Sequence, residues 1–73
     1  MHQQFSVAFF EESLRLHIER NKDILSKLEA INGYYRSIVS TLISDNLTKN
    51  SEIVKRIRNL EEAYHNIKNS SGN

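Results

Sequence analysis

The stretch that decides the fold runs from residue 6 to residue 44 and reads SVAFFEESLRLHIERNKDILSKLEAINGYYRSIVSTLIS. Its apolar residues recur in alternating steps of three and four, a spacing that keeps side chains on one stripe of an α-helix. The stripe consists of Val7, Phe10, Leu14, Ile24, Leu28, Ile31, Tyr35, Ile38 and Leu42. Only His17 and Asn21 place polar side chains in it. The spacing predicts one continuous helix from about Ser6 to Ser44.

A second stripe follows the same rule later in the chain. It consists of Ile53, Ile57, Leu60, Tyr64 and Ile67, and it does not share the register of the first. The interruption lies in residues 45–51, which are rich in turn and capping residues. A second helix is therefore predicted over about 52–68, with a disordered tail at 69–73. The chain has no proline and two glycines, so long helices are permitted.

The two stripes predict an all-α fold, an antiparallel helical hairpin with a long first helix and coiled-coil-like packing, in one domain over residues 1–73. The alternative is a three-helix bundle broken at Asn32-Gly33, because glycine after asparagine is a common helix end. That break would give helices at about 6–31, 34–45 and 52–68. The apolar register continues unchanged through Gly33, which favours the long helix.

In the hairpin, the second helix covers only the part of the first that lies nearest the turn. Tyr35 and Tyr64 then face each other across the two helices. The residues expected to form the intramolecular core are Leu25, Leu28, Ile31, Tyr35, Ile38, Leu42, Ile53, Ile57, Leu60, Tyr64 and Ile67.

A difference in length between the two helices points to a partner. A first helix of roughly 39 residues extends about 58 Å, whereas the second reaches about 25 Å. The uncovered N-terminal half of the stripe is then an exposed apolar surface, and such a surface usually marks an interface. The residues expected to form this partner interface are Phe5, Val7, Phe9, Phe10, Leu14, His17, Ile18 and Asn21. His17 and Asn21 either form a polar layer that sets register, or lie where the helix is simply more exposed.

Chemistry-bearing residues form no recognisable site in the sequence. Cysteine is absent, and His2, His17 and His65 do not pair at ligand spacing. Glu61 and His65 lie one helical turn apart, but no further metal ligand is evident. The sequence therefore predicts a protein without enzymatic activity, cofactor, metal or small-molecule substrate.

Charge and hydropathy narrow the partner class further. The formal net charge of +1 gives no general attraction to nucleic acid or anionic lipid. No apolar run approaches the roughly 20 residues of a membrane span, and the N-terminus lacks the basic segment of a secretory signal. We therefore expect a cytoplasmic protein for which membrane and nucleic-acid partners are unlikely.

These features favour a small protein–protein interaction module that binds itself or another chain through its heptad stripe. An adaptor, a co-chaperone, an inhibitor and an assembly subunit all fit this description. The rival hypothesis is a small helical DNA-binding regulator that uses basic residues near the start of the second helix. Those basic residues are Lys49, Lys55, Arg56 and Arg58.

Overall fold

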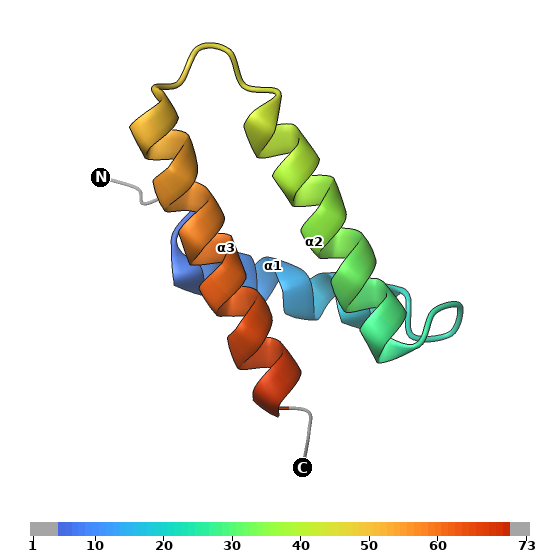
Figure 1. Ribbon diagram of the computed structural model, residues 1–73. Coiled ribbons are helices and arrows are strands. Elements are labelled where there is room, and N and C mark those ends of the chain that lie inside the picture. The colour runs from blue at the N-terminus through green and yellow to red at the C-terminus, as the bar shows by residue number, and fades with distance from the viewer. Residues whose placement is uncertain (1–4, 71–73) are drawn as a thin grey trace.

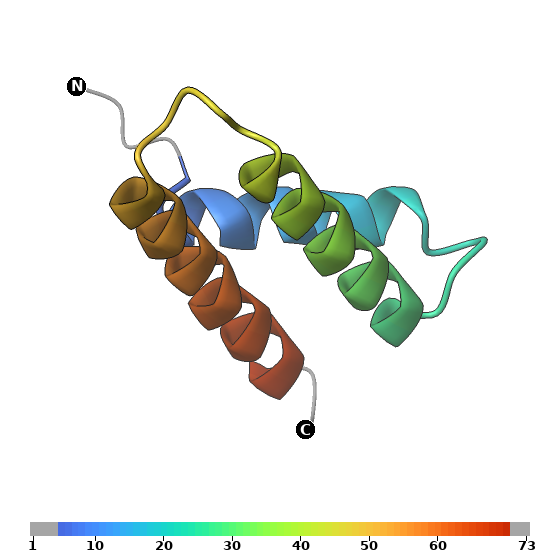
Figure 2. The same cartoon turned by 45° about the horizontal axis from the view of Figure 1, so that its top comes forward.

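Three helices make up the protein in a computed structural model that describes residues 5–70. They are α1 (Val7–Arg20), α2 (Lys27–Ile43) and α3 (Asn50–Ser70) (Figure 1). The chain directions of α2 and α3 are opposed, and α1 passes across one side of this pair (Figures 1 and 2). Each helix packs against both of the others. The all-α prediction is confirmed for the described residues, and the number of helices agrees with the three-helix alternative.

The first helix begins and ends at side-chain caps. The hydroxyl of Ser6 accepts a hydrogen bond from the backbone N–H of Phe9 at 3.1 Å, as an N-cap does. At the other end, the Asn21 backbone N–H donates to the carbonyls of His17 and Ile18. The Asn21 side-chain amide also donates to the His17 carbonyl at 2.8 Å. Asn21 is polar within the stripe because it ends a helix.

The second helix begins with a capping box. The Ser26 hydroxyl accepts from the Glu29 backbone N–H at 3.2 Å, and the Glu29 carboxylate accepts from the Ser26 backbone N–H at 3.0 Å. Asn21 and Ser26 thus bracket a loop, and the prediction of one helix from Ser6 to Ser44 is wrong. Helix caps act through single hydrogen bonds and do not change the heptad spacing of the apolar residues. That spacing therefore gave no sign of the break between α1 and α2.

The alternative break at Asn32-Gly33 is also wrong in position. Both residues lie inside α2, and Gly33 does not have the positive φ of a helix-ending glycine. A methyl group added at Gly33 would meet nothing within 4 Å. This glycine therefore occupies an ordinary exposed helical position.

The turn between α2 and α3 lies where the sequence predicts it. The Asp45 carboxylate accepts from the backbone N–H of Leu47 at 2.9 Å, from that of Thr48 at 3.2 Å, and from the Thr48 hydroxyl. These hydrogen bonds hold the pKa of Asp45 below its usual value. The third helix continues through Asn69 and Ser70, where the tail was expected to begin, and residues 71–73 lie outside the described range.

The core lies where the three helices meet. Of the predicted core residues, Ile31, Leu42, Ile53, Leu60 and Ile67 are buried, and Leu25, Tyr35, Ile38, Ile57 and Tyr64 are half-buried. Leu28 is 53% exposed, so its assignment to the core is wrong. Three further residues are buried although the apolar spacing does not predict it: Ala30, Tyr34 and Ala63.

The N-terminal half of the stripe lies inside the molecule. Phe10 is 0% exposed and Leu14 is 1% exposed, so neither side chain is available to a partner in this structure. The loop after Asn21 lets α1 fold back across α2 and α3, and the apolar side of α1 is covered by its own chain. As a result, the longest Cα extent of the molecule is 37 Å instead of about 58 Å.

Phe5, the first residue that the structure describes, contacts α3. Its φ is 67°, a left-handed conformation that costs a bulky residue about 1–3 kcal/mol. The Asn59 amide donates to the Phe5 carbonyl at 3.2 Å, and the Arg56 guanidinium carbon lies 4.7 Å from the centroid of the Phe5 ring. These two contacts offset the strain and fix the entry into α1.

Candidate interaction surface

The predicted interface residues lie in several different environments. Phe10 and Leu14 are core residues, and Asn21 is a helix cap. Another group is half-buried and packs against the core, and it consists of Phe5, Val7 and Ile18. Phe9, at 45% exposed, is the member of the set that presents a large apolar side chain to solvent. The predicted interface is therefore not one exposed surface.

His17 points toward α2, where its ring lies 5.7 Å from that of Tyr34 between centroids. Tyr34 is buried, and its hydroxyl has no hydrogen-bond partner of good geometry. Burial raises the pKa of Tyr34, and the Ser13 hydroxyl only partly offsets this. Because His17 and Ser13 both belong to α1, Tyr34 marks the side of α2 that faces α1.

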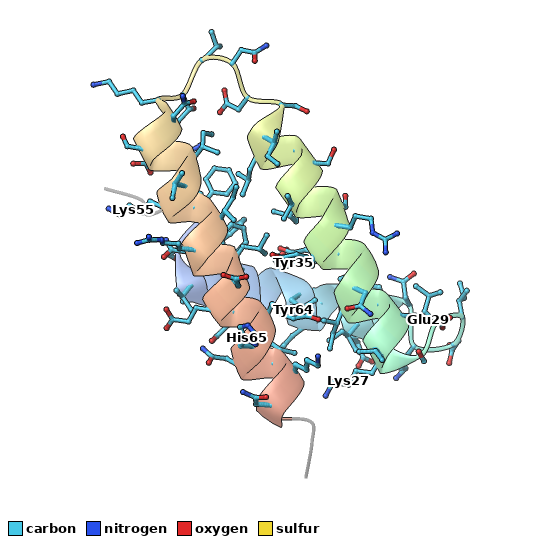
Figure 3. The ribbon with its side chains drawn as sticks, in the orientation of Figure 1. Lys27, Glu29, Tyr35, Lys55, Tyr64 and His65 are labelled. Carbon is cyan, nitrogen blue, oxygen red and sulfur yellow. The ribbon has the colours of Figure 1, made fainter. Side chains whose placement is uncertain are left out.

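Tyr35 marks a different side of α2, because the next residue in a helix is rotated by about 100°. Its ring packs against that of Tyr64 with centroids 4.9 Å apart, as the two stripes predict (Figure 3). The Tyr64 hydroxyl donates to the side-chain oxygen of Asn32 at 3.1 Å. Burial, and then the charge of Glu61, raise the pKa of Tyr35. This aromatic pair joins α2 to α3 on a side away from Tyr34.

Exposed apolar residues extend from the aromatic pair along both helices. Leu28 and Ile43 on α2 are 53% and 63% exposed, and Val54 on α3 is 51% exposed. On α2, steps of seven and four residues place four apolar side chains on one side of the helix: Leu28, Tyr35, Val39 and Ile43. On α3, steps of three and seven residues do the same for Val54, Ile57 and Tyr64. We call this surface the open face. Its exposed members are Leu28, Ile43 and Val54, and its half-buried members, which also pack against the core, are Tyr35, Val39, Ile57 and Tyr64.

The sequence contained a partial signal for the open face. Steps of four residues connect Tyr35, Val39 and Ile43, a second stripe beside the main one. The prediction of an interaction surface was based on the heptad stripe instead, because that stripe is longer. Only the position of α1 decides which of the two stripes on α2 is covered.

The outer side of α1 carries a smaller apolar surface. Phe9 and Leu16 lie two turns apart and are 45% and 49% exposed. Together with Glu12 and Ser13 they line a shallow depression of about 230 Å³. Two apolar side chains separated by a carboxylate and a hydroxyl offer less continuous apolar contact than the open face.

Arg56, one of the four basic residues near the start of α3, lies beside acidic side chains. Arg56 Nη1 lies 3.7 Å from Asp45 Oδ2, and Arg56 Nε lies 3.4 Å from Glu52 Oε2. Its guanidinium also lies over the Phe5 ring. Arg56 therefore contacts Asp45 of the turn, Glu52 of α3 and Phe5 before α1. These contacts give Arg56 a stabilising role.

Within residues 5–70, no group of three or more histidine, cysteine or acidic side chains is arranged to hold a metal ion. None of the helices described is long and apolar enough to cross a membrane. Glu61 and His65, one turn apart on α3, have no third ligand beside them in this part of the chain.

The fold defines the chain as a small all-α protein of three packed helices with two exposed apolar faces. Residues 3–70 match the protein family described as YvfG protein. A relative from Bacillus subtilis (strain 168), named Uncharacterized protein YvfG, is 52% identical over 68 residues, which cover 93% of each chain. The chain therefore belongs to the YvfG family.

Proposed function

We propose that this protein is a small non-enzymatic protein–protein interaction module whose open face receives an amphipathic helix of another chain. The supporting observation is the pair Tyr35 and Tyr64, which joins two helices into one apolar surface on the side that α1 leaves uncovered. Aromatic residues of this kind contribute strongly to protein interfaces. Adaptors, co-chaperones, inhibitors and assembly subunits all work through such a face.

The chemistry of the open face describes the partner. A helix with apolar residues at heptad spacing would lie along α2 and α3 and add a fourth helix to the bundle. Glu61 lies near Tyr35, so a basic residue beside the partner's apolar stripe would be favoured. A second copy of the chain is the simplest partner, because its own helices carry such stripes. A different chain with the same pattern would fit equally well.

Sedimentation of the freshly isolated monomer, concentrated to high micromolar levels, tests the open face. We expect rapid, reversible self-association that Val39→Asp abolishes, because a carboxylate would be buried among apolar side chains. Ser40→Asp, an exposed change on another side of α2, is the matched control and should leave association intact. Circular dichroism of both variants confirms that the helices remain folded.

Other outcomes would show which part of the proposal is wrong. If Leu16→Asp abolishes association and Val39→Asp does not, the outer side of α1 is the interface and the open face is not. If the wild-type chain stays monomeric, the partner is a different chain, and an added amphipathic basic helix should bind the wild-type protein but not Val39→Asp. A shift of duplex DNA that weakens steeply with salt would support the rival DNA-binding function.

A further inference from the structure

The loop between α1 and α2 contains nothing that forces the chain to leave a helix. Residues 21–26 include no glycine or proline, and Phe5 is the one non-glycine residue of the described chain with positive φ. The Leu25 backbone N–H already donates to the Asn21 carbonyl at 2.8 Å, which is the spacing of an α-helix. Side-chain caps at Asn21 and Ser26 hold the break, and each acts through only a few hydrogen bonds.

Two apolar residues beside this loop lie in the register of a continuous helix but have no cover. Ile24 is 80% exposed and Leu28 is 53% exposed. Both continue the three-and-four spacing that runs from Leu14 to Ile31. The apolar pattern is therefore satisfied by one long helix, whereas the loop leaves part of that pattern in water.

From these observations we infer that residues 21–26 are a hinge through which two copies of the chain exchange α1. In the exchanged dimer, α1 and α2 form one helix of about 55 Å. Each α1 then packs on α2 and α3 of the second copy, and Phe10 and Leu14 occupy the pockets that they fill in the monomer. The exchange adds backbone hydrogen bonds across the former loop and brings Ile24 and Leu28 of the two copies together. Apart from Leu28, which also belongs to the open face, it uses different contacts from the open face, and it goes beyond the proposed function.

A contact between α1 and α3 provides the test. The Asn66 side-chain amide donates to the Glu11 carboxylate at 2.7 Å, and the chain has no cysteine of its own. In the double variant Glu11→Cys/Asn66→Cys, a short bis-maleimide should join the two positions. The link forms within one chain when α1 is closed and between chains when α1 is exchanged. We expect protein refolded from guanidinium at high concentration to give a covalent dimer on a denaturing gel.

Mixing the two single variants gives an independent measurement. Glu11→Cys and Asn66→Cys, refolded together, should form a cross-linked dimer, whereas each variant alone should form much less. Ser26→Ala removes a cap from each of two hinges, so it should raise the association constant of the exchanged dimer by about fivefold or more. Ser40→Ala is the matched control and should leave it unchanged.

The inference is overturned if the refolded double variant gives only intrachain links, whether it sediments as a monomer or as a dimer. Val39→Asp separates this inference from the proposed function. It should abolish the rapid association at the open face but leave the covalent dimer of the double variant intact. Loss of the covalent dimer in Val39→Asp would mean that the dimer depends on the open face and not on exchange of α1.

Discussion

Replacing Phe10 with alanine should unfold much of the protein, whereas the same change at the adjacent Phe9 should be mild. Phe10 is 0% exposed, and its ring contacts Phe5 and Phe9 at centroid distances of 5.9 and 5.5 Å. Phenylalanine-to-alanine changes in a core cost about 3–5 kcal/mol, through lost transfer energy and a residual cavity. Phe9 is 45% exposed and leaves no enclosed cavity, so its loss should cost about 1 kcal/mol.

The loss of stability in Phe10→Ala is large compared with the total stability of a domain of this size. A domain of 73 residues has a free energy of unfolding of about 4–11 kcal/mol. Phe10→Ala therefore removes a large part of the stability, and Phe10→Leu, at about 1.5 kcal/mol, gives a measurable folded variant. The assay is urea unfolding followed by far-ultraviolet circular dichroism, at protein concentrations low enough to keep the chain monomeric.

The comparison of Phe9 with Phe10 distinguishes the observed fold from the hairpin expected from sequence. In the hairpin both residues lie on an uncovered segment, and neither substitution would greatly alter the stability of the monomer. Equal effects of Phe9→Ala and Phe10→Ala, within about 0.5 kcal/mol of each other, would refute the burial of α1 against α2 and α3.

Three further changes test local features of the structure. Gly33→Ala should raise the free energy of unfolding by up to about 1 kcal/mol, because the position is helical and open, and a lower thermal midpoint would contradict this. Ser26→Ala should lower it by about 1 kcal/mol through loss of the capping box with Glu29, measured by urea unfolding of the monomer. Absorbance titration should show the phenols of Tyr34 and Tyr35 ionising above their ordinary pKa, and both should return to it in guanidinium. Because the folded state raises these pKa values, their contribution to stability is complete below about pH 10 and declines as the pH rises through the folded pKa, so an alkaline gain in stability would be inconsistent.

The periodicity of the sequence determined the secondary-structure class and much of the core. Ile31, Leu42, Leu60 and Ile67 were assigned to the core from spacing alone and are buried. Their burial follows from helical geometry, because residues three and four apart must share a side. The turn at 45–51 was equally readable, since Asp45 and its neighbours have the chemistry of turns and caps.

The position of the first break lay beyond the periodic signal. Asn21 and Ser26 end and start helices through a few hydrogen bonds, which do not alter the spacing of apolar residues. Gly33 carried the stronger local signal for a break, yet it lies within α2 because an exposed helical glycine costs only about 1 kcal/mol.

By itself, the sequence determined that the chain forms helices with apolar stripes and which residues those stripes contain. Only the tertiary structure decided which stripe is covered. The path of α1 buried Phe10 and Leu14, which had been assigned to a partner, and left Leu28 and Ile43 exposed beside Tyr35. The physical reason is that a stripe fixes the direction of side chains around a helix axis. What lies opposite them depends on where the chain turns, and in this protein a few capping hydrogen bonds set that turn.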